Sequence, residues 1–497
     1  MSVDLDTTGN DVEIGNVVLR TPGLTGVAES HEPAADNPLR GPEGFDDELA
    51  DILREQDIRR DETIEITEAS EEFDADETPG VVRRTANDEP AFEVDVNAPN
   101  EGQEQIVLFT DEFGVTTWNF ARDVTGSRDI TRGSGGKRTY VLRRTVPVPG
   151  DGRGPLGDLG SKIIRVLRFP IVDDAIGFVA DKFVDRWEEK HHRARLRTFT
   201  VDDKATPGRD LTEADLDVLR ADRALLLIHG TGSSTQGGLG GMVDEVVAKL
   251  HEAYGRRVFA FDHPTIGTAP RMNAANLLNE LHGQGWKLDI ITHSRGGLVA
   301  RYLIEQANEL GTQPGKLEVG KVVFVGVPNA GTPLADVEHM EDFINTYTTL
   351  INVLGRGVPP LAVLGTIIAV AKQIAAAAFT GLDGLTSMDP DGDFLTNTLN
   401  VGPAGPEAYF ALASNYEPPP GSGLAAFRDA LHDSVFKKAE NDMIVPTVGV
   451  FQLADGASSQ RFPVKAHRRF EAADAVDHSS FFKTPAAAQQ ILEWLTQ

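Results

Sequence analysis

One serine in this chain stands where an apolar strand turns directly into a helix that begins with two glycines. Residues 288–301 read Leu-Asp-Ile-Ile-Thr-His-Ser-Arg-Gly-Gly-Leu-Val-Ala-Arg, so Ser294 follows the strand pattern and Gly296 comes two positions later. A serine on such a sharp turn presents its hydroxyl above the sheet edge, where it can act as a nucleophile. The alternative is that Ser294 only caps the following helix. Thr292 occupies a position where the G-x-S-x-G pattern usually has glycine, and a small residue can be accommodated there.

An acyl-transfer serine also needs backbone N–H groups that stabilise the negative oxygen of the tetrahedral intermediate. The apolar run 224–228 ends in His-Gly-Thr-Gly, whose glycines allow the backbone to approach a substrate closely. We expect the amides of Thr231 and Arg295 to be these donors. A phosphate-binding loop is the alternative, but no Gly-Lys-[Ser/Thr] follows. We expect His229 to support the loop, and the candidates for lining the substrate site are His229, Gly230, His263 and His293.

The general base and its carboxylate partner should follow the serine in chain order. His478 lies in a loop before the last helical pattern, and Asp442 lies on a loop that enters an apolar segment. A carboxylate there would accept the Nδ1 proton of His478 and leave Nε2 free to accept the proton of Ser294. The sequence therefore predicts Ser294, Asp442 and His478 as the catalytic residues. The competing residues are His432, which precedes Asp442, and the carboxylates Asp433, Asp474 and Asp477.

Alternating strand and helix patterns from about Leu211 onward predict the elements that must position these residues. Short apolar runs alternate with amphipathic helical patterns, which is typical of a mostly parallel sheet with helices on both faces. The predicted strands are 224–228, 257–261, 288–292, 321–327 and 408–413, and the predicted helices are 239–253, 273–282 and 296–310.

The N-terminal part differs in composition from the rest. Residues 1–100 carry 27 acidic and 7 basic side chains, which accounts for −20 of the net charge of −29. We expect residues 1–90 to be an acidic, largely disordered tail with one short helix at 44–58. Residues 91–200 are expected to form a small β-rich and helical unit, with strands at 91–96, 105–110 and 139–148 and helical segments within 163–187. Residues 201–497 are then the main α/β domain.

Composition excludes several classes of function. The chain has no cysteine, so disulfides, thiolate metal sites and a cysteine nucleophile are excluded. We expect no metal, no cofactor and, because no basic patch offsets the acidic charge, no nucleic-acid partner. The start has no basic, apolar leader, and the longest apolar stretch, 359–379, is interrupted by Lys372 and Gln373. We therefore expect a cytoplasmic protein without a transmembrane segment.

The ordered motifs resemble those of the α/β-hydrolase superfamily, and most closely its lipase-like branch, which includes class 2 lipases and GPI-inositol-deacylase-like proteins. The resemblance covers roughly residues 220–497. It is carried by the motifs that begin at His229, Thr292, Val325, Asn441 and Asp477. It implies the α/β-hydrolase fold, with a helical cap inserted at about 334–400. Thr292 and the charged Arg295 depart from the commonest residues of the family, which leaves the triad intact and the substrate open.

Together these observations predict a serine hydrolase that cleaves carboxylic esters through an acyl-enzyme. A cap rich in Leu, Val, Ile and Ala favours a small-molecule or lipid-like ester. Two alternatives stay open. The chain could be a partner-recruiting or signalling module on a hydrolase scaffold, with the acidic N-terminal region binding a protein partner. It could also be a thioesterase, amidase or acyltransferase, because these use the same triad.

Overall fold

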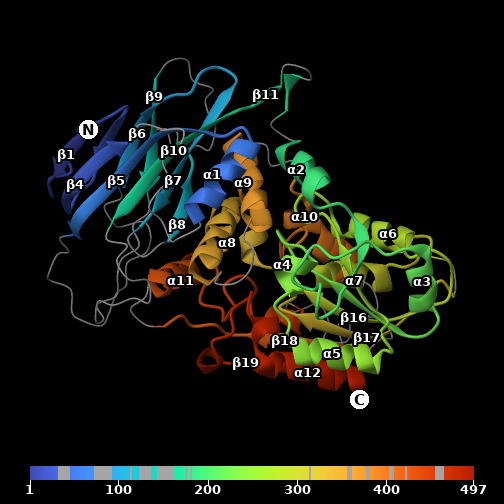
Figure 1. Ribbon diagram of the computed structural model, residues 1–497. Helices are drawn as coiled ribbons and strands as arrows, with labels where there is room; N and C mark the ends of the chain where they lie inside the picture. The colour runs from blue at the N-terminus through green and yellow to red at the C-terminus, as the bar shows by residue number, and fades with distance from the viewer. Residues whose placement is uncertain are drawn as a thin grey trace.

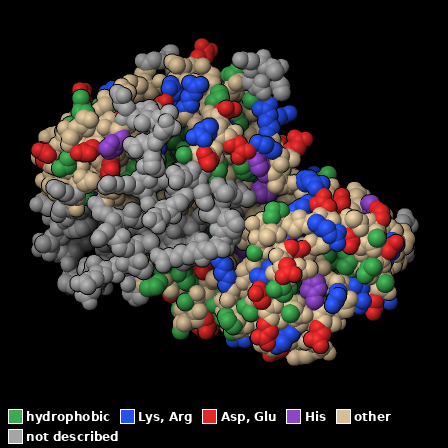
Figure 2. Space-filling view, in the orientation of Figure 1, with side chains coloured by type: hydrophobic (Ala, Val, Ile, Leu, Met, Phe, Trp, Pro, Cys, Tyr) green, Lys and Arg blue, Asp and Glu red, His purple; other side chains and the backbone are tan. Residues whose placement is uncertain are grey.

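The structure is a computed structural model. It describes residues 1–31, 45–71, 92–111, 115–121, 136–142, 161–173, 177–179, 182–312, 315–354, 361–376, 381–401, 408–419, 423–453 and 464–497. An N-terminal β-sheet body and a C-terminal α/β body lie on either side of two helices, α8 and α9 (Figure 1). Acidic and basic side chains are interspersed over the visible face of the α/β body (Figure 2).

The α/β body is built on a seven-stranded sheet in the order β13-β15-β14-β16-β17-β18-β19. Only the edge strand β13 runs antiparallel to its neighbour; the other adjacent pairs are parallel. The strands are β13 (Arg195–Thr198), β14 (Ala224–Ile228), β15 (Val258–Asp262), β16 (Trp286–His293), β17 (Leu317–Val325), β18 (Ala408–Ser414) and β19 (Val464–Phe470). The five predicted strands of this body are thus confirmed, and the two edge strands are additions. The edge strands carry charged side chains, which hid them from an apolar pattern search.

Helices cover both faces of this sheet, because the inner strands are apolar on both sides. In β14, Leu226 and Ile228 face a core that includes α6 and α7, while Leu225 and Leu227 face a second core with α5 and α12. Figure 1 shows α5 and α12 together on one side of the strands. The helices of this body include α3 (Glu213–Arg220), α4 (Thr235–Leu239), α5 (Asp244–Ala253), α6 (Pro270–Glu280), α7 (Gly296–Glu305), α11 (Gly423–Ser434) and α12 (Pro485–Thr496).

The N-terminal body is a sandwich of two antiparallel sheets with the strand orders β1-β4-β5-β10-β7-β8 and β2-β3-β6-β9. Apolar side chains from both sheets form one shared core between them. The strands are β1 (Ser2–Leu5), β2 (Val12–Ile14), β3 (Val17–Arg20), β4 (Leu24–His31), β5 (Arg59–Glu71), β6 (Phe92–Asn97), β7 (Gln103–Thr110), β8 (Thr116–Asn119), β9 (Lys137–Leu142) and β10 (Lys162–Pro170). A two-stranded ribbon, β11 (Val172–Asp173) and β12 (Gly177–Phe178), follows.

The prediction of a largely disordered tail over 1–90 is wrong for residues 1–31 and 45–71. Five of the sandwich strands and helix α1 (Phe45–Glu55) lie in these ranges. The sparse apolar residues alternate with polar ones, so that Ile64 and Ile66 point into the sandwich core while the acidic side chains between them point outward. Composition alone predicted disorder because it ignores this alternation. The small unit therefore begins at the N-terminus, and the prediction that it spans only 91–200 is corrected.

The prediction of helical segments across 163–187 is wrong for its first half, which forms strand β10. Both faces of β10 are buried: Ile164 and Val166 face the sandwich core, and Leu167 and Phe169 face the helices. A strand that is apolar on both faces has no period of two, so periodicity could not distinguish it from a buried helix. Helix α2 (Phe183–His191) follows at the end of the predicted range.

A helical insertion lies between β17 and β18, where the cap was predicted at 334–400. It contains α8 (Met340–Leu354), α9 (Leu361–Ala375), α10 (Asp383–Thr386) and a π-helical turn at Phe394–Leu399. Apolar residues of α8 and α9 belong to the same core as the outer face of the sandwich and α1. No helix in the described ranges has both the length and the hydropathy to cross a bilayer.

The folded acidic segment can be tested with Ile66→Ala. Ile66 is fully buried in the sandwich, so we expect the substitution to lower the free energy of unfolding by about 2–5 kcal/mol in chemical denaturation. The exposed Glu29→Ala is the control, with a change within about 0.5 kcal/mol. Equal stabilities for the two variants would contradict the sandwich.

Candidate active site

Ser294 lies on the tight turn between β16 and α7. Its φ of 51° is in the left-handed region, which a non-glycine residue rarely adopts. The turn is close to its neighbours: a Cβ added to Gly296 would lie 2.4 Å from the carbonyl oxygen of His229, and one added to Gly297 would lie 2.4 Å from Val327 Cγ1. Thr292 is accommodated because its hydroxyl donates to the carbonyl of Val323 at 3.3 Å. Helix and strand packing thus determines the position of Ser294.

The carboxylate of Asp442 holds the ring of His478. Nδ1 of His478 donates to Oδ2 of Asp442 at 2.8 Å, and the His478 amide donates to the Asp442 carbonyl at 3.0 Å. The other carboxylate oxygen accepts the amides of Ile444 at 3.1 Å and Val445 at 2.8 Å. Three donors therefore stabilise the negative charge of Asp442, which is 1% exposed.

Gly326 brings Ser294 and the His478–Asp442 pair together. The amide of Ser294 donates to the carbonyl of Val325 at 2.9 Å, directly before Gly326. A Cβ added to Gly326 would lie 3.2 Å from Asp442 Oδ2 and 3.3 Å from His478 Cε1. Ser294 Oγ and His478 Nε2 are both buried and have no hydrogen-bond partner in the described part of the chain. Catalytic hydrogen bonds of this kind often form only when substrate is present.

The predicted oxyanion loop lies against the serine. A Cβ added to Gly230 would lie 2.5 Å from Ser294 Cβ, so only glycine fits there without a shift. Gly232 donates its amide to Thr265 Oγ1 at 2.9 Å, which holds the loop. Within the described residues, the amides of Thr231 and Arg295 have no hydrogen-bond acceptor. Two free amides next to one serine are what an oxyanion hole requires.

The side chain of Arg295 is directed away from the serine. It is fully buried, and it donates to the carbonyls of Gly384, from Nε at 2.8 Å, and of Thr268. Burial lowers the pKa of Arg295 to about 10, and the carboxylate of Glu188 opposes this shift. Arg295 therefore stays protonated at neutral pH and connects the serine turn to α10. Its charge does not select the substrate through direct contact in this conformation.

The three histidines named as lining candidates are buried around the serine turn and the oxyanion loop. His229 stacks on His263 with ring centroids 4.3 Å apart, and its Nδ1 bonds the carbonyl of Gly230 at 3.0 Å. His293 Nε2 donates to the carbonyl of His478 at 2.9 Å, which supports the loop of the general base. Among the described residues, no three His, Asp or Glu side chains are grouped as a metal site would need.

Two residues that the sequence did not single out contact this site. Glu188 of α2 accepts the amides of Thr265, Ile266 at 2.7 Å and Gly267 at 2.8 Å, so it fixes the segment after β15. Tyr347 of α8 faces the nucleophile: burial raises the pKa of its phenol, the Asp442 charge adds to this, and the hydroxyls of Ser294 and Thr231 oppose it. Each lies on an ordinary amphipathic helix, so no local signal could have identified it.

Comparison with known families gives one match. A family model described as "Domain of unknown function (DUF7379)" matches residues 191–496, which includes all seven strands of the α/β sheet and the complete candidate site. The sandwich strands lie outside the matched residues. No curated protein matches the sequence.

Three solved structures illustrate the likeness in three dimensions. The mature Bacillus licheniformis lipase BlEst2 is 18% identical, with a TM-score of 0.35, and the alignment covers 61% of this chain and 98% of the lipase. Lipase 1 from Pelosinus fermentans is 14% identical, with a TM-score of 0.39 and coverages of 55% and 98%. A putative alpha/beta hydrolase family protein from Desulfitobacterium hafniense is 15% identical, with a TM-score of 0.30 and coverages of 56% and 97%.

The buried His293 predicts a loss of stability in acid. Burial first, and then the neighbouring His478, lower the pKa of His293 from 6.5 to about 3. Between these values the unfolded chain binds a proton at His293 that the folded protein does not bind. The free energy of unfolding should therefore fall with pH, by at most about 1.4 kcal/mol per pH unit for this group.

Urea unfolding over a pH series measures this slope. We expect His293→Gln to flatten the slope and His282→Gln, which changes an exposed histidine, to leave it unchanged. The same slope in His293→Gln as in the unsubstituted protein would contradict the prediction.

Proposed function

The chain belongs to the family described as a domain of unknown function (DUF7379), and we propose that it is a serine hydrolase that cleaves carboxylic esters. One observation carries the proposal. Nδ1 of His478 is held by Asp442 at 2.8 Å, and its free Nε2 is buried at the same glycine, Gly326, as the Ser294 turn. This is the arrangement of a nucleophile, base and acid in an α/β-hydrolase.

In the acylation step, Ser294 Oγ attacks the ester carbonyl carbon while His478 Nε2 accepts the serine proton. The carbonyl π bond opens, and its electron pair becomes the negative charge on the oxygen. The amides of Thr231 and Arg295 are proposed to donate to that oxygen, each contributing about 3–4 kcal/mol in the transition state. The intermediate collapses with loss of the alcohol, which takes the proton from His478.

In the deacylation step, water replaces the alcohol. His478 Nε2 accepts a proton from the water as its oxygen attacks the acyl-enzyme carbonyl, and the same proton returns to Ser294 Oγ when the acid leaves. Asp442 stabilises the transient imidazolium in both steps because it is ionised and fixed by three donors.

The first test is labelling with a fluorophosphonate, which reacts with an activated serine. We expect stoichiometric labelling at Ser294 and none in Ser294→Ala. Ser414→Ala is the matched control, because Ser414 is equally buried at 1% exposure but bonds the carbonyl of Val476. Labelling of Ser294→Ala would show that the nucleophile is assigned wrongly, and an unlabelled parent protein would overturn the hydrolase proposal.

The second test separates the two carboxylates near the base. Asp442→Asn should lower kcat for p-nitrophenyl acetate by about 10⁴-fold, because an amide no longer holds the correct tautomer of His478. Asp477→Asn should retain most of the activity, because the Asp477 carboxylate bonds the amide and hydroxyl of Ser479. A larger loss in Asp477→Asn than in Asp442→Asn would contradict the proposed triad.

A further inference from the structure

We propose that the N-terminal sandwich and helix α2 set the depth of an acyl pocket beside Ser294, so that the enzyme takes esters of short acyl chains, from acetyl to butyryl. This inference rests on the proposed esterase function and assigns its substrate class. It is built from a cavity, from the two helices that form its walls and from the residues behind them.

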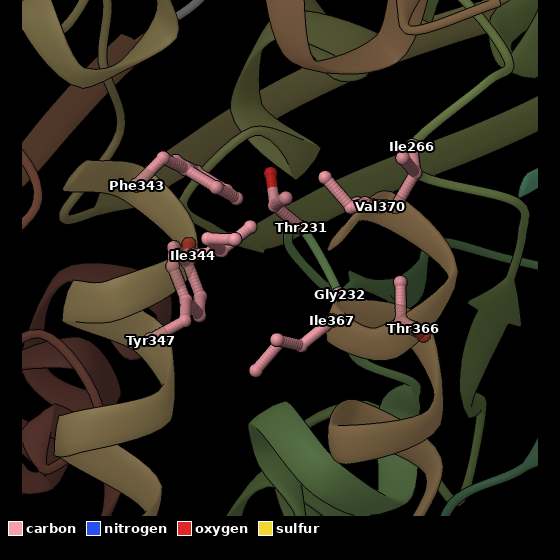
Figure 3. A pocket seen from close by; sticks show the side chains of 9 residues that line it. All are labelled: Thr231, Gly232, Ile266, Phe343, Ile344, Tyr347, Thr366, Ile367 and Val370. Carbon is pink, nitrogen blue, oxygen red and sulfur yellow. The ribbon is translucent and has the colours of Figure 1, made fainter. Parts of the chain in front are cut away.

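The cavity begins at the oxyanion loop. The loop contributes Thr231 and Gly232, Ile266 comes from the segment that Glu188 holds, and no charged side chain lines it. Figure 3 shows side chains of two facing helices converging on this space from opposite sides. An apolar space next to an oxyanion hole suits the alkyl part of an acyl group. The lining side chains from the helices are Phe343, Ile344, Tyr347, Thr366, Ile367 and Val370.

The space is small. The centre of a water-sized sphere can occupy about 10 Å³ of it, which is about the room that one water molecule needs. A long acyl chain would require α8 and α9 to separate. Whether the pocket is short in solution therefore depends on how firmly these two helices are held.

Helix α9 is held from behind by residues of the N-terminal part. Trp187 Nε1 donates to Thr366 Oγ1 at 3.2 Å, and Thr366 itself lines the cavity. Gln56 Nε2 donates to the carbonyl of Gly365 at 2.6 Å. The fit is close, because a Cβ added to Gly365 would lie 2.1 Å from Trp187 Cζ2. The wall of the pocket thus lies directly on the indole ring of Trp187.

Helix α8 is held in the same way by the sandwich. The backbone amide of Trp118, in β8, donates to Asn345 Oδ1 at 2.7 Å, and its Nε1 donates to Thr348 Oγ1 at 2.9 Å. Asn345 and Thr348 are each adjacent in sequence to a cavity-lining residue. Because Trp118 is fully buried, separating α8 from the sandwich would leave its donors unpaired.

The two walls are therefore fixed from outside the α/β body. Trp187, Trp118 and Gln56 all precede the residues that match the family model, 191–496. The catalytic residues come from the family part, and the pocket depth comes from the N-terminal part. Entry of a substrate requires local displacement of side chains over Ser294, but it need not move α8 or α9 apart.

The test uses the full chain and p-nitrophenyl acetate, butyrate and octanoate. We expect kcat/KM for the octanoate to be the lowest of the three in the parent protein. Val370→Ala removes two methyl groups from the wall, so the octanoate-to-butyrate ratio should rise about tenfold. Val247→Ala, a fully buried valine on the other face of the sheet, is the control with an unchanged ratio.

The contact behind α9 is tested by a pair of substitutions with opposite effects. Trp187→Phe removes Cζ2 and the indole donor, so α9 should relax outward and the ratio should rise. Gly365→Ala should press α9 inward and lower the butyrate-to-acetate ratio, and Trp187→Phe should relieve this in the double variant. Trp494→Phe is the matched control, since both tryptophans are 7% exposed and Trp494 packs on Phe410 far from the cavity.

The outcomes separate this inference from the proposed function. If Ser294 is labelled and the esters are hydrolysed, but octanoate is preferred or Val370→Ala and Trp187→Phe leave the chain-length profile unchanged, the pocket inference is wrong and the esterase proposal stands. If Ser294 is not labelled, both are overturned. If Gly365→Ala does not fold, the other variants still decide, because they remove atoms and do not add any.

Discussion

The close packing of α7 against the carboxyl ends of the central strands is the constraint on which the rest of this structure depends. Gly296 and Gly297 let the helix approach so closely that Ser294 is forced to a φ of 51°. The same closeness recurs at Gly230 and Gly326, which leave room for the serine and for the imidazole–carboxylate pair. Because β14, β16 and β17 are adjacent in the sheet, all of these glycines meet at one place. The chemistry is positioned by the absence of side chains as much as by their presence.

Buried polar groups around the site are arranged so that most charges have partners. Asp442 accepts three donors, and Glu188 accepts three backbone amides close to the buried guanidinium of Arg295. Such networks are costly to leave incomplete, so they fix the loops that carry them. Against this background, the unpartnered Oγ of Ser294 and Nε2 of His478 are exceptions in the described part of the chain. They are the two atoms that the proposed reaction requires to be free for proton transfer.

The N-terminal sandwich is part of the same hydrophobic core as the cap. Helix α9 is apolar around most of its circumference, and it is covered by α1, α2 and the outer face of the sandwich on the side away from the serine. Lys372, its buried charge, donates to the carbonyl of Gln56 and lies over the ring of Phe183. The acidic residues of the N-terminal region accordingly face outward from a folded body, whose inner surface supports the helices over the site.

The sequence by itself determined the order of the chemical groups and the type of most elements in the α/β body. Ser294, Asp442 and His478 were identifiable because turn chemistry and apolar runs are local, and five strands were predictable because each is a short apolar segment. The tertiary structure decided what depends on distant contacts: that strands form within the acidic segment, that β10 is a strand buried on both faces, and that Tyr347 and Glu188 reach the site. Those outcomes depend on which surface an element packs against, and no local pattern of residues contains that information.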